Sequence, residues 1–144
     1  MGKFKISEIM FVDDDAIVRL VGSKILKSIE FDKKISHFEN GQKAIDDIQE
    51  RIQTNNFPSE DSPIMILLDI NMPTMDAWGF LDAFQDFDYE IKKYFLISII
   101  TSSIDSSDKT RAFLYPDVMD YIQKPLSGKH VIDFLSRHHL YSEE

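Results

Sequence analysis

Residues 64–73 of the chain are Ile-Met-Ile-Leu-Leu-Asp-Ile-Asn-Met-Pro, a run of five apolar residues that ends at one carboxylate, Asp69. A short apolar run bounded by a breaker is typical of a strand buried on both faces, as strands are in parallel sheets. In open parallel α/β sheets, ligands bind just beyond the carboxyl ends of the strands. We therefore expect Asp69 to lie at the edge of a cleft, with Pro73 helping to fix the loop that follows.

The rest of the chain alternates between short apolar runs and stretches with helical spacing. Strands are also predicted at residues 9–12, 35–38, 95–100 and 119–122, and helices at about residues 16–29, 41–52, 78–87, 107–114 and 128–138. This alternation implies right-handed crossovers and a parallel sheet covered on both faces. The expected fold is α/β, a doubly wound (βα)5, flavodoxin-like three-layer sandwich with sheet order 2-1-3-4-5. Its switch point, between the first and third strands, would bring Asp13 and Asp14 next to Asp69.

Local signals support the helices. Asp15 can cap the first helix and Ser127 the last, since their side chains can accept hydrogen bonds from first-turn amides. Residues 54–63 are polar and include two prolines, which predicts a surface loop. Apolar residues at the spacing of one helix face are Ile17, Leu20, Val21, Ile25 and Ile29 in the first helix and Ala44, Ile45, Ile48 and Ile52 in the second.

Composition narrows the class of protein. The 144 residues, of which 43% are hydrophobic, suit one domain, and the lack of cysteine excludes disulfides and thiolate metal sites. No apolar run approaches the roughly 20 residues that a membrane helix needs, and the polar N-terminus does not resemble a signal peptide. We expect a soluble, cytoplasmic protein with no membrane partner. The net charge of −9 argues against direct DNA binding and favours cations or basic protein surfaces as partners.

Polar residues stand at four predicted strand ends: Asp13 and Asp14, Asp69, Thr101 and Lys124. Three carboxylates in one cleft repel each other unless a cation lies among them. Oxygen ligands without histidine or cysteine favour Mg²⁺, with Mn²⁺ as the substitute, over zinc or copper. A lysine and a hydroxyl facing the metal complete a phosphoryl site, in which a carboxylate would attack in line.

These motifs resemble those of the two-component response-regulator receiver domain. The matched residues are Phe11-Val12-Asp13-Asp14, residues 67–73, Thr101-Ser102 and Lys124-Pro125-Leu126, and the similarity covers about residues 7–138. The resemblance implies that Asp69 is the phosphoacceptor. It implies that Asp14, Asp69 and the main-chain carbonyl of Asn71 bind Mg²⁺ directly, that Asp13 binds it through water, and that Thr101 and Lys124 contact the phosphoryl group. It also implies a cis peptide bond before Pro125.

The resemblance further implies how the signal leaves the domain. The Thr101 hydroxyl would move toward the phosphoryl group and the Tyr121 ring would turn inward. The surface of the fourth predicted helix, fifth strand and last helix would then change. Asn71 and Ser103 match positions that tune hydrolysis of the acyl phosphate. One departure is Ala77, where the family usually has glycine; if that position needs a positive φ, alanine would strain the loop by about 1 kcal/mol.

We therefore expect residues 1–144 to be a single, stand-alone receiver domain without an output domain. It would take its phosphoryl group from a histidine kinase or phosphotransfer protein and signal by binding a downstream protein, as a monomer or weak dimer. It would be no enzyme beyond self-catalysed phosphorylation and autodephosphorylation.

Two other functions are compatible with some of the same residues. A haloacid-dehalogenase-type phosphatase would use Asp13 as nucleophile in the motif Asp13-Asp14-Asp15. Against it, Ile17 stands where threonine or valine is usual, and Asp69 precedes the lysine that the second acidic motif should follow. A pure interaction module would never be phosphorylated, and the intact set of site residues argues against it.

Overall fold

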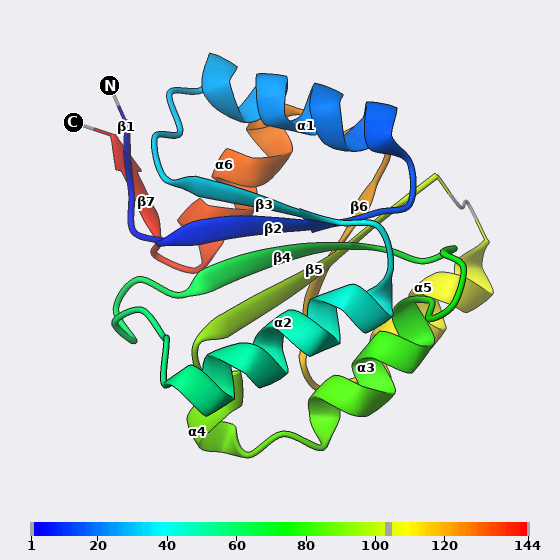
Figure 1. Ribbon diagram of the computed structural model, residues 1–144. Helices are drawn as coiled ribbons and strands as arrows, with labels where there is room; N and C mark the ends of the chain where they lie inside the picture. Colours follow the sequence, from blue (N-terminus) through cyan, green and yellow to red (C-terminus); the bar gives the residue numbers. More distant parts are fainter. Residues whose placement is uncertain (1, 103–104, 144) are drawn as a thin grey trace.

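The computed structural model describes residues 2–102 and 105–143, with a five-stranded parallel sheet at the centre of the molecule (Figure 1). The strands lie in the order β3-β2-β4-β5-β6. Because a short strand β1 precedes the first predicted one, this is the expected order 2-1-3-4-5, and the doubly wound flavodoxin-like fold is confirmed. The five strands are β2 (Glu8–Val12), β3 (Lys34–Phe38), β4 (Ile64–Asp69), β5 (Phe95–Thr101) and β6 (Val118–Gln123).

Helices cover both faces of the sheet and complete the three layers. On one face lie α1 (Ala16–Ser28) and α6 (Gly128–Arg137), and on the other lie α2 (Gly41–Thr54), α3 (Ala77–Gln85) and α5 (Ser106–Ala112) (Figure 1). Each face therefore has its own apolar layer, one beneath α1 and α6 and one beneath α2 and α3.

Strand β4 is the buried centre of the sheet, since all six of its residues are buried. Its side chains alternate between the two layers: Met65 and Leu67 pack on the side of α1 and α6, while Ile66 and Leu68 pack on the side of α2 and α3. The strand thus carries Asp69 from the core to the carboxyl edge of the sheet.

Both predicted N-caps are confirmed. The Asp15 carboxylate accepts hydrogen bonds from first-turn amides of α1, the nearest at 2.9 Å. The Ser127 hydroxyl accepts from the amide of His130 in α6 at 3.1 Å. Each cap fixes the path by which a loop at the carboxyl edge enters its helix.

Helix α1 does not bury its whole apolar stripe. Ile17, Leu20 and Val21 are 71%, 56% and 49% exposed. The helix approaches the sheet through Gly22, where a Cβ atom would lie only 2.5 Å from the Phe11 ring. The spacing predicted the helix correctly, but the close contact runs through the glycine and leaves part of the apolar face uncovered.

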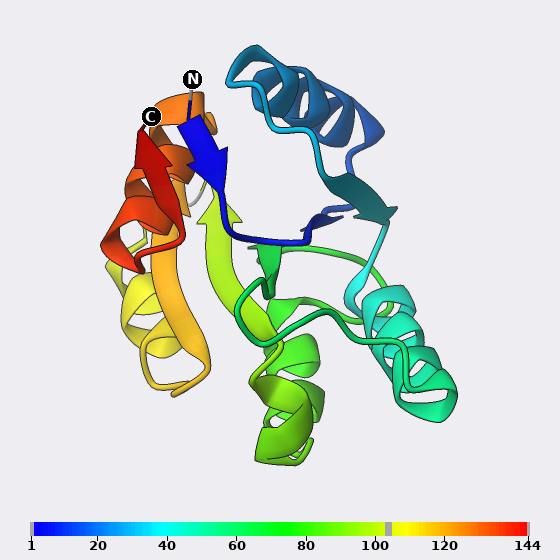
Figure 2. The same cartoon turned by 90° about the vertical axis from the view of Figure 1, so that its left-hand side faces the viewer.

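The two ends of the chain form structure that we did not expect. Strand β1 (Gly2–Phe4) pairs in antiparallel fashion with β7 (Tyr141–Glu143), so secondary structure extends beyond residues 7–138, the range that the receiver resemblance covers (Figure 2). Phe4 packs edge-on against Phe31 and Tyr141, with ring centroids 5.2 and 4.9 Å away. Strands of three residues carry too little alternation to be detected from the sequence.

A second unexpected element is the short helix α4 (Tyr89–Lys92), which lies before β5. The predicted surface loop at residues 54–63 is confirmed, except that Thr54 still belongs to α2. Phe57 of this loop stacks on Tyr94 with ring centroids 4.7 Å apart, and Glu60 pairs with Lys93.

Over the described ranges 2–102 and 105–143, none of the helices combines the length and the apolar character needed to cross a lipid bilayer.

Ser98 offers a test of the packing in β5. The residue is fully buried, and its hydroxyl has no hydrogen-bond partner within the described part of the chain. Burying an unpaired hydroxyl costs free energy, so Ser98→Ala should raise the free energy of unfolding by about 0.5–1 kcal/mol. Urea unfolding followed by circular dichroism measures this change.

The matched control is Ser36→Ala in β3, because the Ser36 hydroxyl donates to the Glu8 carboxylate. Losing a hydrogen bond to a charged group should cost about 1.5–3 kcal/mol. If Ser98→Ala destabilised the protein as much as Ser36→Ala, the Ser98 hydroxyl would have to be paired.

Candidate functional site

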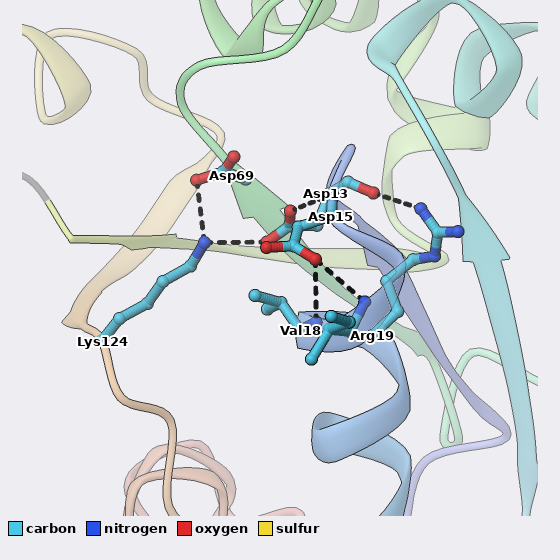
Figure 3. A network of polar contacts seen from close by, with 7 residues as sticks. Asp13, Asp15, Val18, Arg19, Asp69 and Lys124 are labelled. Atoms are coloured by element: carbon cyan, nitrogen blue, oxygen red, sulfur yellow. Dashed lines mark hydrogen bonds and ion pairs between the residues drawn. The ribbon is translucent and has the colours of Figure 1, made fainter.

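The carboxyl edge of the sheet gathers polar side chains from neighbouring strands. Asp13 follows β2, Asp69 ends β4, Thr101 ends β5 and Lys124 follows β6. Figure 3 shows Asp13, Asp69 and Lys124 directed toward one another at this edge. The strand ends converge as expected for the switch point of a doubly wound sheet.

The three carboxylates form a compact cluster. Asp13, Asp14 and Asp69 each offer an oxygen within 4.8 Å of the others. Asp13 and Asp69 are buried, whereas Asp14 is exposed. Ligands on opposite sides of an octahedral Mg²⁺ lie about 4.2 Å apart. Only two of three ligands can lie opposite each other, and adjacent ones lie about 3 Å apart, so the cluster would contract to hold Mg²⁺; its all-oxygen composition suits a hard divalent cation.

Lys124 bridges two of these carboxylates. Its Nζ lies 2.8 Å from Asp13 Oδ2 and 3.3 Å from Asp69 Oδ1. Burial alone would lower the pKa of Lys124, but the hydrogen bond to Asp13 and the charge of Asp69 raise it overall. The ammonium group is thus held in the charged form beside Asp69. The Lys124–Pro125 peptide bond is cis, the isomer that the resemblance implies.

The pKa of Asp69 is raised to about 6, first by burial and then by the charge of Asp13. Lys124 opposes this rise but does not cancel it. A buried carboxylate with this pKa is ionised at neutral pH and is costly to keep charged. A second positive charge at the cluster would therefore be strongly favoured.

Asp13 is held from several directions. Its amide donates to the carbonyl of Phe38 at 3.0 Å, and its Oδ1 accepts from the amide of Asp15 at 2.9 Å. Its carbonyl accepts a hydrogen bond from Nη1 of Arg19 at 2.5 Å (Figure 3). Arg19 is not among the predicted site residues. A signal was available, because Arg19 lies one turn after the Asp15 cap and helical side chains point back toward the N-terminus.

The loop after Asp69 crosses the edge of the sheet, with Asn71 exposed. Thr74, with φ at 68°, takes the left-handed conformation, whereas Ala77 begins α3 without a positive φ. The strain considered for Ala77 therefore does not arise. The Gly41 amide donates to the carbonyl of Met75 at 2.9 Å, and a Cβ at Gly41 would clash with the same oxygen. Glycine allows the turn before α2 to approach this loop.

The remaining predicted site residues lie toward β6. Thr101 is buried, and its carbonyl accepts from the amide of Lys124 at 2.7 Å. Tyr121 is half-buried on β6, opposite Ile99 in the ladder, and packs against the apolar layer beneath α2 and α3. Ser103 lies outside the described residues.

Comparison with known proteins agrees with this geometry. A family model described as the response regulator receiver domain matches residues 9–136. A two-component response regulator from Cytophaga hutchinsonii is 26% identical, with a TM-score of 0.79 and 92% of this chain and 96% of that chain covered. A receiver domain protein from Methanospirillum hungatei JF-1 is 28% identical, with a TM-score of 0.63 and coverage of 90% and 89%.

A response regulator receiver protein from Dyadobacter fermentans DSM 18053 has a TM-score of 0.76 at 23% identity, covering 90% of this chain and 95% of that chain; at that identity it shows a shared fold. No curated protein matches this chain at a significant level.

Proposed function

The chain belongs to the response regulator receiver domain family, and from this we propose that it accepts a phosphoryl group on Asp69 from a histidine kinase or phosphotransfer protein. The observation that carries the proposal is the position of Asp69. Its carboxylate ends a fully buried strand, lies 3.3 Å from the Lys124 ammonium and joins two further carboxylates. A buried nucleophile beside a fixed cation suits transfer of a negatively charged group.

In the proposed reaction, an oxygen of ionised Asp69 attacks the phosphorus atom of a phosphohistidine, in line with its phosphorus–nitrogen bond. The new oxygen–phosphorus bond forms as that bond breaks, and the imidazole leaves with the electron pair and takes up a proton. The Lys124 ammonium offsets charge on the phosphoryl oxygens, and the Thr101 hydroxyl donates to one of them. These two residues act by position and charge.

The acid cluster would hold the cation that the reaction requires. Asp14, Asp69 and the main-chain carbonyl of Asn71 would bind Mg²⁺, or Mn²⁺ in its place, and Asp13 would bind it through water. When bound, the cation neutralises charge on the transferred group. Support for this assignment comes from the oxygen donors within 4.8 Å of one another.

The proposed output is a changed surface formed by α5, β6 and α6. A phosphoryl group on Asp69 adds negative charge and hydrogen-bond acceptors close to Thr101, which biases the position of the Tyr121 ring. Phe113, Leu114 and Met119 are exposed large apolar residues on or near α5 and β6. Such residues favour a protein as the downstream partner over DNA. Asn71 and Ser103 would set the lifetime of the acyl phosphate.

The phosphodonor would be a protein that covers the exposed face of α1. Ile17, Leu20 and Val21 begin two residues after the Asp15 cap, beside the acid cluster. An uncovered apolar stripe next to a reactive carboxylate suits a partner that docks there during transfer.

The test is intact-protein mass spectrometry after incubation with acetyl phosphate and Mg²⁺. The wild type should gain about 80 Da, the mass of one phosphoryl group in place of a proton, as in other protein phosphorylation. Asp69→Asn should gain nothing, because an amide oxygen is a poor nucleophile. Omitting Mg²⁺ should reduce the adduct strongly.

Asp13→Asn separates this proposal from the phosphatase alternative. If Asp13 were the nucleophile, Asp13→Asn would abolish turnover of p-nitrophenyl phosphate and Asp69→Asn would not. An adduct of equal size in the wild type and in Asp69→Asn would contradict Asp69 as the acceptor.

A further inference from the structure

One contact at the acid cluster comes from a side chain that touches none of the carboxylates. Arg19 lies in the second turn of α1, and its guanidinium reaches back so that Nη1 lies 2.5 Å from the carbonyl oxygen of Asp13 (Figure 3). The start of the helix is itself fixed, since the Arg19 amide donates to the carbonyl of Asp15 at 3.1 Å. The guanidinium is therefore presented to the Asp13 carbonyl from a capped, ordered helix.

The bonded carbonyl belongs to the peptide unit that joins Asp13 to Asp14. A peptide unit is planar, so fixing its oxygen also fixes the direction in which the Asp14 backbone continues. On the other side, the Asp13 amide is tied to the carbonyl of Phe38 at 3.0 Å. The backbone that leads into Asp14 is thus held by β3 at one end and by α1 at the other.

Asp14 depends on this backbone more than the other two carboxylates do. The Asp13 side chain is held by Lys124 and by the amide of Asp15, and the Asp69 side chain by Lys124. For Asp14, which is exposed, no hydrogen bond to its carboxylate occurs within residues 2–102 and 105–143. What orients its side chain is the peptide unit on which it stands.

We propose that Arg19 is a positioning residue that holds the Asp13–Asp14 peptide unit so that the Asp14 carboxylate is preorganised to bind a divalent cation. This rests on the proposed function, in which Asp14 is a metal ligand. Residues that orient metal ligands through a hydrogen bond commonly contribute 10–100-fold to metal affinity. Arg19 does so through a main-chain atom.

The charge of Arg19 makes the proposal sharply testable. The same guanidinium lowers the pKa of His37, where burial is the larger cause, so its positive charge is felt at this edge of the sheet. If Arg19 acted only through its charge, removing it would strengthen the binding of a cation. If Arg19 acts by positioning, removing it should instead weaken the binding of the cation.

The experiment measures Mg²⁺ binding by isothermal titration calorimetry in the wild type, Arg19→Met, Arg19→Lys and Lys24→Met. Arg19→Met keeps a long side chain but loses the donor and the charge, and should weaken binding about 10-fold. Arg19→Lys keeps a donor and should recover part of the loss. Lys24→Met removes an exposed positive charge from the same helix and should leave binding unchanged or slightly tighter.

A second readout separates positioning from a general loss of structure. With acetyl phosphate as donor, Arg19→Met should require more Mg²⁺ for half-maximal phosphorylation yet approach the wild-type rate at saturating Mg²⁺. Circular dichroism and urea unfolding establish that each variant is folded. A merely structural role would lower stability without this split between Mg²⁺ requirement and maximal rate.

The outcomes distinguish the two proposals. Unchanged or tighter Mg²⁺ binding by Arg19→Met, beside a wild type that binds Mg²⁺ and is phosphorylated, overturns the role of Arg19 and leaves the proposed function intact. A wild type that neither binds Mg²⁺ nor gains a phosphoryl group overturns both. Weaker binding by Lys24→Met of the same size would also overturn the positioning role, because it would show that the loss does not depend on the hydrogen bond to the Asp13 carbonyl.

Discussion

Replacing Arg51 with alanine is expected to lower the free energy of unfolding by about 3–5 kcal/mol, because breaking a buried ion pair leaves an unpaired charge in the protein interior. Arg51 of α2 places Nη2 2.9 Å from both carboxylate oxygens of Glu8, at the start of β2. Both residues are buried, and Nε of Arg51 also donates to Asp47 at 2.8 Å. Urea unfolding followed by circular dichroism measures the loss.

Two controls isolate the buried charge. The double variant Glu8→Gln with Arg51→Met removes both charges and should recover at least about half of the loss, since replacing a whole buried pair costs far less than breaking it. Lys43→Ala breaks the exposed pair between Lys43 of α2 and Glu39, which precedes the helix, and should cost less than about 0.5 kcal/mol. An Arg51→Ala cost as small as that of Lys43→Ala would mean that the Glu8 pair contributes no more than a surface contact.

This pair also shows where sequence reasoning stops. Glu8 and Arg51 lie 43 positions apart in the sequence, and nothing in their surroundings there distinguishes them from charged residues on the surface. Only the pairing of β2 with β4 and the packing of α2 against the sheet bring them together. By contrast, β4 could be predicted closely, because an unbroken apolar run has few stable places other than the centre of a parallel sheet.

Helix α1 is an intermediate case. The spacing of Ile17, Leu20 and Val21 is sufficient to predict a helix, because it matches the repeat of an α-helix. The spacing does not indicate whether another helix or strand covers that apolar face. The close approach at Gly22 depends on Phe11, a residue of a different element, so it emerges only from the assembled structure.

The acid cluster was more accessible to sequence reasoning than its supports. Asp13, Asp14, Asp69 and Lys124 follow apolar strands, and parallel strands end at one edge, so their meeting follows from topology. The spacing of Arg19 from the Asp15 cap places it near the start of α1, but it contacts a main-chain oxygen, which every residue possesses, so no residue pattern marks that oxygen as its target. The fold, the carboxylates and the lysine could therefore be predicted, whereas the hydrogen bond from Arg19 to Asp13 could not.

The other large effect expected is a pH dependence that belongs to Asp69. An aspartate in an unfolded chain has a pKa of about 3.9, whereas burial and the charge of Asp13 raise the folded-state pKa of Asp69 to about 6. The folded protein therefore holds this proton more tightly than the unfolded chain. Asp69 favours folding fully below about pH 4, and that contribution is lost as the pH rises through about 6.

Asp69→Asn should not lose stability in this way as the pH rises, because an amide does not ionise. Relative to the wild type, its free energy of unfolding should rise between about pH 4 and pH 7, reaching an advantage of about 2 kcal/mol at pH 8 in the absence of divalent cations. Urea unfolding of both proteins across this range, in a chelator-containing buffer, measures the difference. Using the difference between the two proteins cancels the titration of all other groups.

Mg²⁺ should reduce the difference in free energy of unfolding between Asp69→Asn and the wild type, and the size of the reduction should depend on pH. A cation that binds only the folded state stabilises it by mass action, and it competes with the proton for the Asp69 carboxylate. At pH 8 we expect Mg²⁺ to stabilise the wild type clearly more than Asp69→Asn, and at pH 5 the gain should shrink.

Asp32→Asn, at an exposed position away from the cluster, serves as the control and should follow the wild type throughout. If Asp69→Asn paralleled the wild type from pH 4 to 8, Asp69 would titrate as an ordinary surface carboxylate. The charge repulsion that would favour a cation at this edge of the sheet would then be absent.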